Sequence, residues 1–513
     1  MKFFNTSGPC EPEDHYMVNC AERLTSLYSL IENKRYFIFH GPRQTGKTTN
    51  MIAFTRELNA QEQYLALYVN VEAGQACRND VEAVNEIIVS EFEHAAMTFL
   101  SEQYLPSENC YQFRSLNTGL GTFLTKWCME LPKPLVLFLD EVDALIGDSL
   151  ISVLRQLRSG YARRPKAFPH AMGLIGVRDI RDYRIYSDSS KKYIIGGSAF
   201  NIKEKSLRLN NFTLTQINDL YTQHTDVTGQ AFTRQAIARV FDLTDGQPWL
   251  VNALAREICF EDRIAQGLAV TVDHVDRAKE VLIERRDVHL DQLADKLSEP
   301  RVMRVIQNIL LGEYQENNIL PDDIQYLIDL GLIKKGSVGL EIANSIYREV
   351  IPRELTVVTQ MSINQNPAWY THENGKLNIN KLLDEYILFY KQHSEMITAR
   401  KTYTEAAHHL FFMAWLQRIV NSGGMIDREY AAGLKRLDLC VNFAGERFAF
   451  ELKLSSQSAL DDGKKQLVNY LNRLELNCGY LIIFNRKKID DWNVVGKKDV
   501  IEYEGKQITV IYL

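Results

Sequence analysis

The stretch that decides the fold is Tyr36-Phe-Ile-Phe-His-Gly-Pro-Arg-Gln-Thr-Gly-Lys-Thr-Thr49. Its apolar start predicts a short buried strand, and the G-x-x-x-x-G-K-T turn that follows predicts a loop that binds phosphate. Gly41 and Gly46 allow the backbone to point N–H groups at phosphate oxygens. Lys47 can reach the β- and γ-phosphates, and the Thr48 hydroxyl can bind Mg²⁺. The stretch therefore predicts a nucleotide-binding loop.

A helix over residues 50–58 is expected directly after this loop. The N-terminal end of a helix attracts anions, so strand, loop and helix occur in the order that a phosphate site requires. We expect the nucleotide to be bound by the whole loop, which comprises Gly41, Pro42, Arg43, Gln44, Thr45, Gly46, Lys47, Thr48 and Thr49.

A second stretch, Leu135-Val-Leu-Phe-Leu-Asp-Glu-Val-Asp143, predicts the partner of this loop. A continuous apolar run is typical of a strand that is buried on both faces of a parallel sheet. Carboxylates at the end of such a strand emerge at the edge of the sheet where ligands bind. We expect Asp140 to hold Mg²⁺ together with Thr48, and Glu141 to act as the base that polarises the attacking water.

Residues 171–177 predict a further strand, which Arg178 follows directly. An arginine at this place can sense the γ-phosphate, or it can form a surface ion pair with Asp179 or Asp182, and the sequence leaves both open. The basic stretch 178–205 can contact nucleic acid or a partner, although a solvated insertion loop is the simpler interpretation.

Residues 213–284 have a helical pattern that is interrupted by Asp245-Gly-Gln-Pro-Trp-Leu-Val251. Gly246 and Pro248 fit a turn between two helices. With the two earlier motifs, this turn resembles the AAA-like and STAND branches of P-loop ATPases over about residues 15–290. The resemblance implies a helical lid over the nucleotide, with Pro248 near ATP. It also implies a prokaryotic protein with a role in defence or mobile-element biology.

Composition limits the possible classes of protein. The chain has 513 residues, a net charge of −6 and 45% hydrophobic residues, which is ordinary for a multi-domain globular protein. No apolar run is long enough for a membrane span, and the start lacks a secretory signal pattern. The eight cysteines have no metal-binding spacing, so we expect reduced thiols in a cytoplasmic protein.

Residues 296–355 look like a winged helix, with two short strands flanking a turn from Gly336 to Gly339. Such a module can dock in a DNA groove. Its second helix is acidic, because it contains Asp322, Asp323 and Asp329, which favours a structural or interaction role.

The last hundred residues contain a second group of polar side chains. Asp438 lies in a predicted strand over 434–442, and a predicted hairpin partner over 447–454 contains Glu451 and Lys453. The side chains of Glu451 and Lys453 point to the same face because they are two residues apart. Two acidic groups supply oxygen ligands for Mg²⁺, and a nearby lysine suits phosphodiester hydrolysis.

This pattern resembles the PD-(D/E)XK nuclease superfamily over about residues 400–513. Glu405 matches the acidic residue of its first helix, and Gln466 with Tyr470 matches the helix motif of its RecB-like exonuclease branch. Leu437 departs from the residue usual before the aspartate. The resemblance implies catalytic roles for Glu405, Gln466 and Lys453, and metal ligation by Asp438 and Glu451.

The predicted fold is α/β, with a parallel-sheet P-loop ATPase core, a helical lid, a winged-helix domain and a C-terminal restriction-endonuclease-like domain. The expected boundaries are 1–210 for the core, 211–290 for the lid, 291–357 for the winged helix, 358–400 for a connector and 401–513 for the nuclease-like domain.

The leading functional hypothesis is an ATPase that gates a Mg²⁺-dependent DNA nuclease. DNA is the expected partner, with a protein partner or self-association also open and no membrane contact. The main alternative is an ATP-switched interaction protein whose nuclease-like domain only docks a partner or DNA. A helicase is third, because no additional helicase motif is present.

Overall fold

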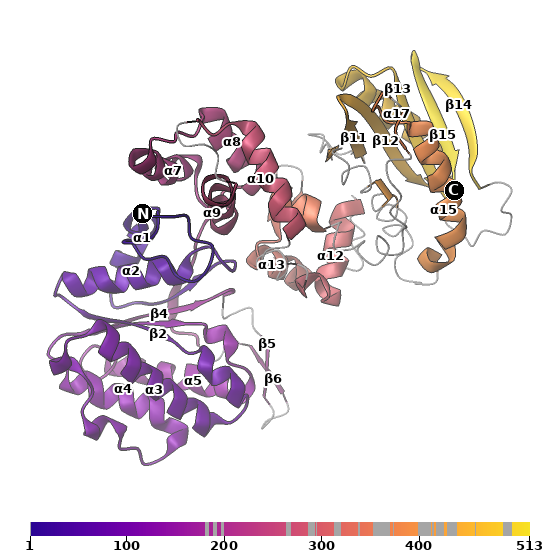
Figure 1. Cartoon of the computed structure of the whole chain (residues 1–513). Coiled ribbons are helices and arrows are strands. Elements are labelled where there is room, and N and C mark those ends of the chain that lie inside the picture. Colours follow the sequence, from indigo (N-terminus) through magenta and orange to yellow (C-terminus); the bar gives the residue numbers. More distant parts are fainter. Residues whose placement is uncertain are drawn as a thin grey trace. The chain divides into compact units, whose positions relative to one another are not determined.

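A five-stranded parallel sheet forms the centre of the N-terminal part of the chain (Figure 1). Its strand order is β2-β3-β4-β1-β7. The strands are β1 (Tyr36–His40), β2 (Leu65–Asn70), β3 (Leu135–Asp140), β4 (Ala171–Gly176) and β7 (Lys203–Arg208).

The computed structural model describes residues 2–179, 184–187, 192–195, 200–262, 268–285, 293, 295–311, 320–336, 339–351, 370–372, 374–398, 412, 415–416, 425–427, 439–456, 458–485 and 495–513.

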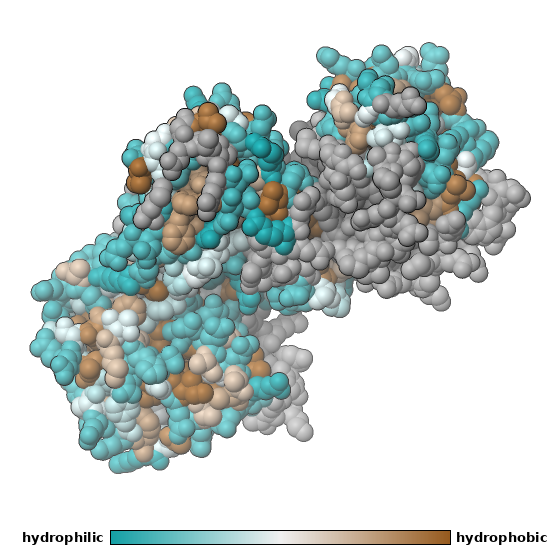
Figure 2. Space-filling model, in the orientation of Figure 1, coloured by the Kyte–Doolittle hydropathy of each residue, from teal (hydrophilic) through white to brown (hydrophobic). Residues whose placement is uncertain are grey.

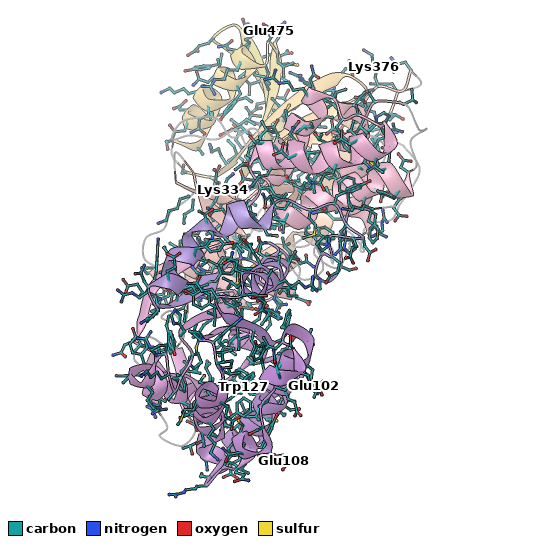
Figure 3. All side chains as sticks on the ribbon, turned by 90° about the vertical axis from the view of Figure 1, so that its left-hand side faces the viewer. Glu102, Glu108, Trp127, Lys334, Lys376 and Glu475 are labelled. Atoms are coloured by element: carbon teal, nitrogen blue, oxygen red, sulfur yellow. The ribbon has the colours of Figure 1, made fainter. Side chains whose placement is uncertain are left out.

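Helices cover both faces of this sheet, so β1, β2, β3 and β4 are buried on both sides, whereas the edge strand β7 is polar and partly exposed. Leu24 of α1 (Cys20–Glu32) and Phe54 of α2 (Lys47–Ala60) pack on one face. The opposite face is covered by α3 (Val81–Phe99), α4 (Gly119–Glu130) and α5 (Gly147–Gly160). Trp127 of α4 lies fully buried in that layer (Figure 3). The predicted α/β core with a parallel sheet is confirmed.

The described residues directly after β7 form α7 (Leu214–Thr228), α8 (Arg234–Thr244), α9 (Pro248–Arg256) and α10 (Val272–Arg285), with a π-helical turn at Glu257–Glu261 after α9. The α8–α9 turn requires glycine at position 246. Gly246 has a φ of +69°, and a Cβ there would lie 1.9 Å from the carbonyl oxygen of Phe212. The turn is thereby fixed against the chain segment that leaves β7.

The chain before α1 packs on these helices. Phe4 contacts the rings of Tyr221 and His224 on α7, and the indole N–H of Trp249 donates to the carbonyl of Thr6 at 2.8 Å. The sequence analysis did not anticipate this packing. Figure 2 shows that the visible outer face of these parts is mainly hydrophilic, with isolated hydrophobic residues.

By its internal contacts the chain forms two compact units. The first comprises Met1–His289 together with two later segments, Ile324–Ile333 and Ala343–Ile346. The later segments belong to the range in which a winged helix was expected. That range contains α12 (Pro300–Leu311), α13 (Pro321–Asp329), β8 (Ile333–Lys335) and β9 (Leu340–Ile342).

The basic stretch that was expected to be a solvated loop contains two strands. β5 (Arg184–Ser187) and β6 (Lys192–Ile195) pair antiparallel, and the residues around them lie outside the described part of the chain.

The second unit contains a six-stranded sheet in the order β10-β11-β12-β13-β15-β14. Its strands are β10 (Met425–Asp427), β11 (Leu439–Phe443), β12 (Glu446–Leu454), β13 (Cys478–Phe484), β14 (Lys497–Tyr503) and β15 (Lys506–Tyr512). β11 and β12 form the predicted hairpin, whereas β12, β13 and β15 run parallel. The sequence analysis did not anticipate β14 and β15.

Among the described elements, α17 and α15 cover opposite faces of this second sheet. α17 (Ala459–Arg473) connects β12 to β13 and packs Leu467 on one face, near Ala449. α15 (Ile379–Thr398) packs Tyr386 on the other face, near Phe450. α15 falls in the range expected to be a connector, yet its apolar residues are part of this core.

Candidate functional site

The phosphate-binding loop predicted from the sequence joins β1 to α2. Gln44 and Gly46 have positive φ angles of 58° and 85°. Left-handed residues alternating with ordinary ones form the backbone concavities that bind anions. The loop is also tight at its start, because a Cβ on Gly41 would lie 3.3 Å from the carbonyl oxygen of Leu209. The Thr45 hydroxyl donates to the Pro42 carbonyl at 2.8 Å and holds the turn closed.

Lys47 begins α2 and lies inside this loop. Its Nζ donates to the carbonyls of Gly41 at 2.9 Å and Pro42 at 3.0 Å. The side chain is buried, which lowers the pKa of its ammonium group, while the charges of Asp140 and Glu141 act in the opposite direction. A buried ammonium needs anionic or carbonyl partners, so this position is suited to phosphate oxygens.

The loop residues around Lys47 differ in exposure. Arg43 is exposed, whereas Thr48 and Thr49 are half-buried. The Thr49 hydroxyl accepts the backbone N–H of Cys10 at 3.1 Å. The N-terminal segment therefore contacts the first turn of α2, beside the loop.

Asp140, the last residue of β3, is fully buried and receives three hydrogen bonds. Its Oδ2 accepts the Thr48 hydroxyl at 2.8 Å and the Tyr68 hydroxyl at 2.6 Å, and its Oδ1 accepts the Glu141 N–H at 2.9 Å. The structure thus brings together Thr48 and Asp140, the two residues predicted to hold Mg²⁺.

Tyr68 was missed by the sequence analysis. It lies on β2, which neighbours β3, and its ring is buried. Burial, together with the charge of Asp140, raises the pKa of the Tyr68 hydroxyl, so this group stays protonated and acts as a donor. The sequence of β2 does not indicate the hydrogen bond from Tyr68 to Asp140, because this bond depends on which strands are neighbours in the sheet.

Glu141 follows Asp140 with a left-handed backbone, at a φ of 57°. Left-handed conformations in residues other than glycine, asparagine and aspartate are uncommon and cluster at functional sites. Burial raises the pKa of the Glu141 carboxyl, and the charges of Asp140 and Asp143 raise it further. The Asp143 carboxylate accepts the N–H of Val177 at 3.0 Å and so connects this turn to the end of β4.

Arg178 lies two residues beyond β4, at the same edge of the sheet. Its Nε donates to Asp329 at 3.2 Å, and both side chains are largely buried. The two aspartates considered as its partners are placed differently, since Asp179 pairs with Lys203 and Asp182 lies outside the described residues.

The turn before α9 also lies near the phosphate loop. Pro248 is the first residue of α9 and is buried. The Gln247 side chain caps α9 by accepting the N–H of Leu250 at 2.6 Å, and its amide nitrogen is 3.5 Å from the carbonyl oxygen of Gln44. The N-terminal end of α9 therefore faces the loop.

The C-terminal sheet carries the second group of polar side chains. The Glu451 side chain is fully buried on β12, and its Oε1 is 2.6 Å from Nζ of Lys453. These two residues share the face that α17 covers, since Ala449 of the same strand packs there. The Glu451 carboxylate is fully buried, whereas the Lys453 side chain is 24% exposed, so the charge of Glu451 is compensated at the edge of this buried layer.

The structure describes only some of the other residues of this group. Tyr470 is buried on α17, and Gln466 of the same helix has a buried Oε1 that accepts no hydrogen bond from the described residues. Glu405 and Asp438 lie outside the described residues. Within the part of the chain that is described, no group of three His, Cys, Asp or Glu side chains could hold a metal ion.

Several solved structures can be aligned with this chain at low sequence identity. The Walker-type ATPase PABY2304 of Pyrococcus abyssi has 15% identity and a TM-score of 0.47, and the match covers 68% of this chain and 99% of that one. Cdc6p of Pyrobaculum aerophilum has 13% identity and a TM-score of 0.39, covering 70% and 97%. The RuvB Holliday junction branch migration motor of Thermotoga maritima has 13% identity and a TM-score of 0.34, covering 65% and 95%.

These TM-scores are too low to transfer any property of those proteins to this chain. No protein-family model matches the sequence, and no curated protein does either. Among the described residues, no helix is both long enough and apolar enough to cross a membrane.

Proposed function

We propose that this chain is a P-loop ATPase that gates a Mg²⁺-dependent DNA nuclease in its C-terminal domain. The observation that carries the ATPase part is the convergence of Lys47, Thr48, Asp140 and Glu141 at one edge of the parallel sheet. The Thr48 hydroxyl reaches Asp140 across two strand ends at 2.8 Å, with the buried ammonium of Lys47 in the same loop. An AAA-like or STAND-type ATPase fits this arrangement.

The residues of the site have separable roles in this proposal. Thr48 and Asp140 would hold Mg²⁺, which neutralises charge on the phosphates when it is bound. Lys47 stabilises the negative charge that develops on the phosphate oxygens during transfer. Glu141 orients the attacking water and takes its proton, a role that its raised pKa supports. Pro248 and Gln247 place the lid turn against the loop.

Tyr68→Phe is expected to raise the Mg²⁺ concentration needed for ATP hydrolysis by about tenfold, because a hydrogen bond to a charged group contributes roughly 1.5–3 kcal/mol. The change removes one of the three donors that hold the Asp140 carboxylate. The measurement is phosphate release against Mg²⁺ concentration.

Tyr64→Phe is the matched control for this experiment. Tyr64 is also buried, immediately before β2, and its hydroxyl has no described hydrogen bond to Asp140. An equal shift in both variants would contradict the role of Tyr68.

The nuclease part rests on Glu451 and Lys453 beneath α17, together with Asp438, Glu405 and Gln466 from the sequence pattern. Asp438 directly precedes Leu439, which pairs with Phe450, the neighbour of Glu451. A docking module for DNA or a protein is the second candidate. It is favoured by the ion pair itself, because Lys453 already neutralises Glu451 at 2.6 Å.

Gating is tested by measuring the two activities together in the full chain. ATP should change DNA cleavage or DNA affinity by about 5- to 150-fold, the usual range for coupled sites. Because binding coupling is reciprocal, DNA should change ATP affinity in Glu141→Gln protein by the same factor. A DNA cleavage rate that is the same with and without ATP would contradict gating. If no DNA form is cleaved in the presence of metal, the docking module is favoured.

A further inference from the structure

A buried carboxylate from a distant part of the chain lies beside the nucleotide site. Asp329 is the last residue of α13 and is 1% exposed. It accepts Nε of Arg178 at 3.2 Å, and its other oxygen accepts the Gln325 amide at 2.8 Å. The arginine side chain is 12% exposed, so solvent screens this ion pair only weakly.

The segment that carries Asp329 is fixed to the ATPase core by several further contacts. Arg208, at the end of β7, donates to the carbonyl of Ile328 at 2.9 Å. The guanidinium of Arg178 lies 4.9 Å from the centre of the Tyr326 ring. A Cβ on Gly331 would lie 2.7 Å from Cγ of Pro42, in the phosphate-binding loop itself. All of these residues belong to one compact unit.

Arg178 is placed so that it can pair with either of two anions, the Asp329 carboxylate or the terminal phosphate of a nucleotide. β4 lies between β1, which leads into the phosphate loop, and β3, which ends in Asp140. A guanidinium beyond the end of β4 is therefore at the edge of the sheet where the terminal phosphate of a nucleotide would lie. Carboxylate and phosphate oxygens both accept from the planar N–H groups of arginine, so Asp329 competes with that phosphate.

We propose that Asp329 sets the preference of the site for a nucleoside triphosphate over a diphosphate, an inference that rests on the proposed nucleotide binding. A diphosphate leaves Arg178 on Asp329. A triphosphate must draw Arg178 away, so part of its binding energy is used to break the ion pair. The segment 324–333 then loses one of its contacts with the core.

The test compares ATP and ADP affinities of the full-length Glu141→Gln protein with and without Asp329→Asn. Asparagine keeps the shape and can still accept Nε of Arg178 through its amide oxygen, but it removes the competing charge. ATP affinity should increase by about 5- to 150-fold, as for other coupled sites, while ADP affinity stays the same. An equal change for both nucleotides, or no change in either, would overturn the proposal.

Two controls distinguish this effect from a general loss of packing of the segment 324–333. Gln325→Ala removes the other described hydrogen bond to Asp329 without changing charge, so the ATP-to-ADP ratio should stay near that of the parent. In an Arg178→Ala background, Asp329→Asn should no longer change the ratio, which a double-mutant cycle measures. A ratio that still changes there would show that Asp329 acts through some other group.

Hydrogen exchange provides a measurement that does not depend on the stability of the Asp329 variant. In Glu141→Gln protein with Asp329 intact, amides of residues 324–333 should exchange faster with ATP than with ADP. Equal exchange would overturn the proposal. A parent protein that binds neither nucleotide would instead show that the proposed function itself is wrong.

Discussion

Lys47→Ala is expected to weaken ATP binding and to reduce ATP hydrolysis by about 10²–10³-fold. The ammonium is buried and held by two loop carbonyls, so its removal leaves the centre of the phosphate loop without a positive charge. Loss of one positioned charge stabiliser costs about 10²–10³ in turnover. ATP affinity and phosphate release measured on the same preparation check both effects.

Lys126→Ala is a matched control for this substitution. The Nζ of Lys126 also donates to two backbone carbonyls, those of Asn109 and Gln112, but it lies on α4, outside the phosphate loop. Turnover should be unchanged in this variant. Unchanged turnover in Lys47→Ala would instead remove Lys47 from the site.

Glu141→Gln separates hydrolysis from binding. The variant should bind ATP and turn it over about 10²–10⁴-fold more slowly, because a positioned general base contributes that much. Only the ionised carboxylate can accept a proton, and burial raises the pKa of Glu141. Hydrolysis by the unaltered protein should therefore increase with pH through this raised pKa, and the increase should be absent in Glu141→Gln.

The parts of the nucleotide site that are continuous in sequence could be predicted from it. The apolar run before Gly41 and the run before Asp140 indicated β1 and β3, since strands that are buried on both faces require such runs. Two strand ends of a parallel sheet meet at one edge, so the meeting of Thr48 with Asp140 followed from the topology.

Contacts between elements that are not adjacent in sequence could not be predicted. The Tyr68 hydroxyl reaches Asp140 only because β2 lies next to β3, and strand order is not encoded in the periodicity of either strand. Arg178 and Asp329 are 151 residues apart, and the acidic character of α13 favoured a structural or interaction role without indicating a partner for Asp329. Asp329 is buried because the segment 324–333 belongs to the same compact unit as the five-stranded parallel sheet.

In the C-terminal domain, too, some features could be predicted from the sequence and others could not. The hairpin of β11 and β12 was predicted from the sequence. The last two strands were missed. β14 alternates between exposed and partly buried positions, whereas β15 buries Ile508, Val510 and Ile511. Glu451 lies on the face covered by α17, a placement that depends on the packing of the helix and could not be predicted from the sequence.

Lys453→Met is expected to reduce metal-dependent DNA cleavage by about 10²–10⁴-fold, as for loss of a positioned group that acts on the attacking water. Methionine keeps most of the volume of the lysine chain but leaves Glu451 as a buried charge. Removal of one partner of a buried pair costs about 3–5 kcal/mol of stability, so reduced cleavage in this variant alone has two explanations.

The double variant Glu451→Gln/Lys453→Met separates the two explanations. It contains no charge at either position, so its thermal unfolding should return toward that of the unaltered protein. Its cleavage should nevertheless remain lost, because the proposed metal ligand and the proposed catalytic lysine are both gone. Lys376→Met is the control, since Lys376 forms an exposed pair with Glu446 at 2.9 Å in the same domain and should leave cleavage intact. A stable double variant that still cuts DNA at the original rate would show that the buried pair is structural and that any nuclease activity resides elsewhere.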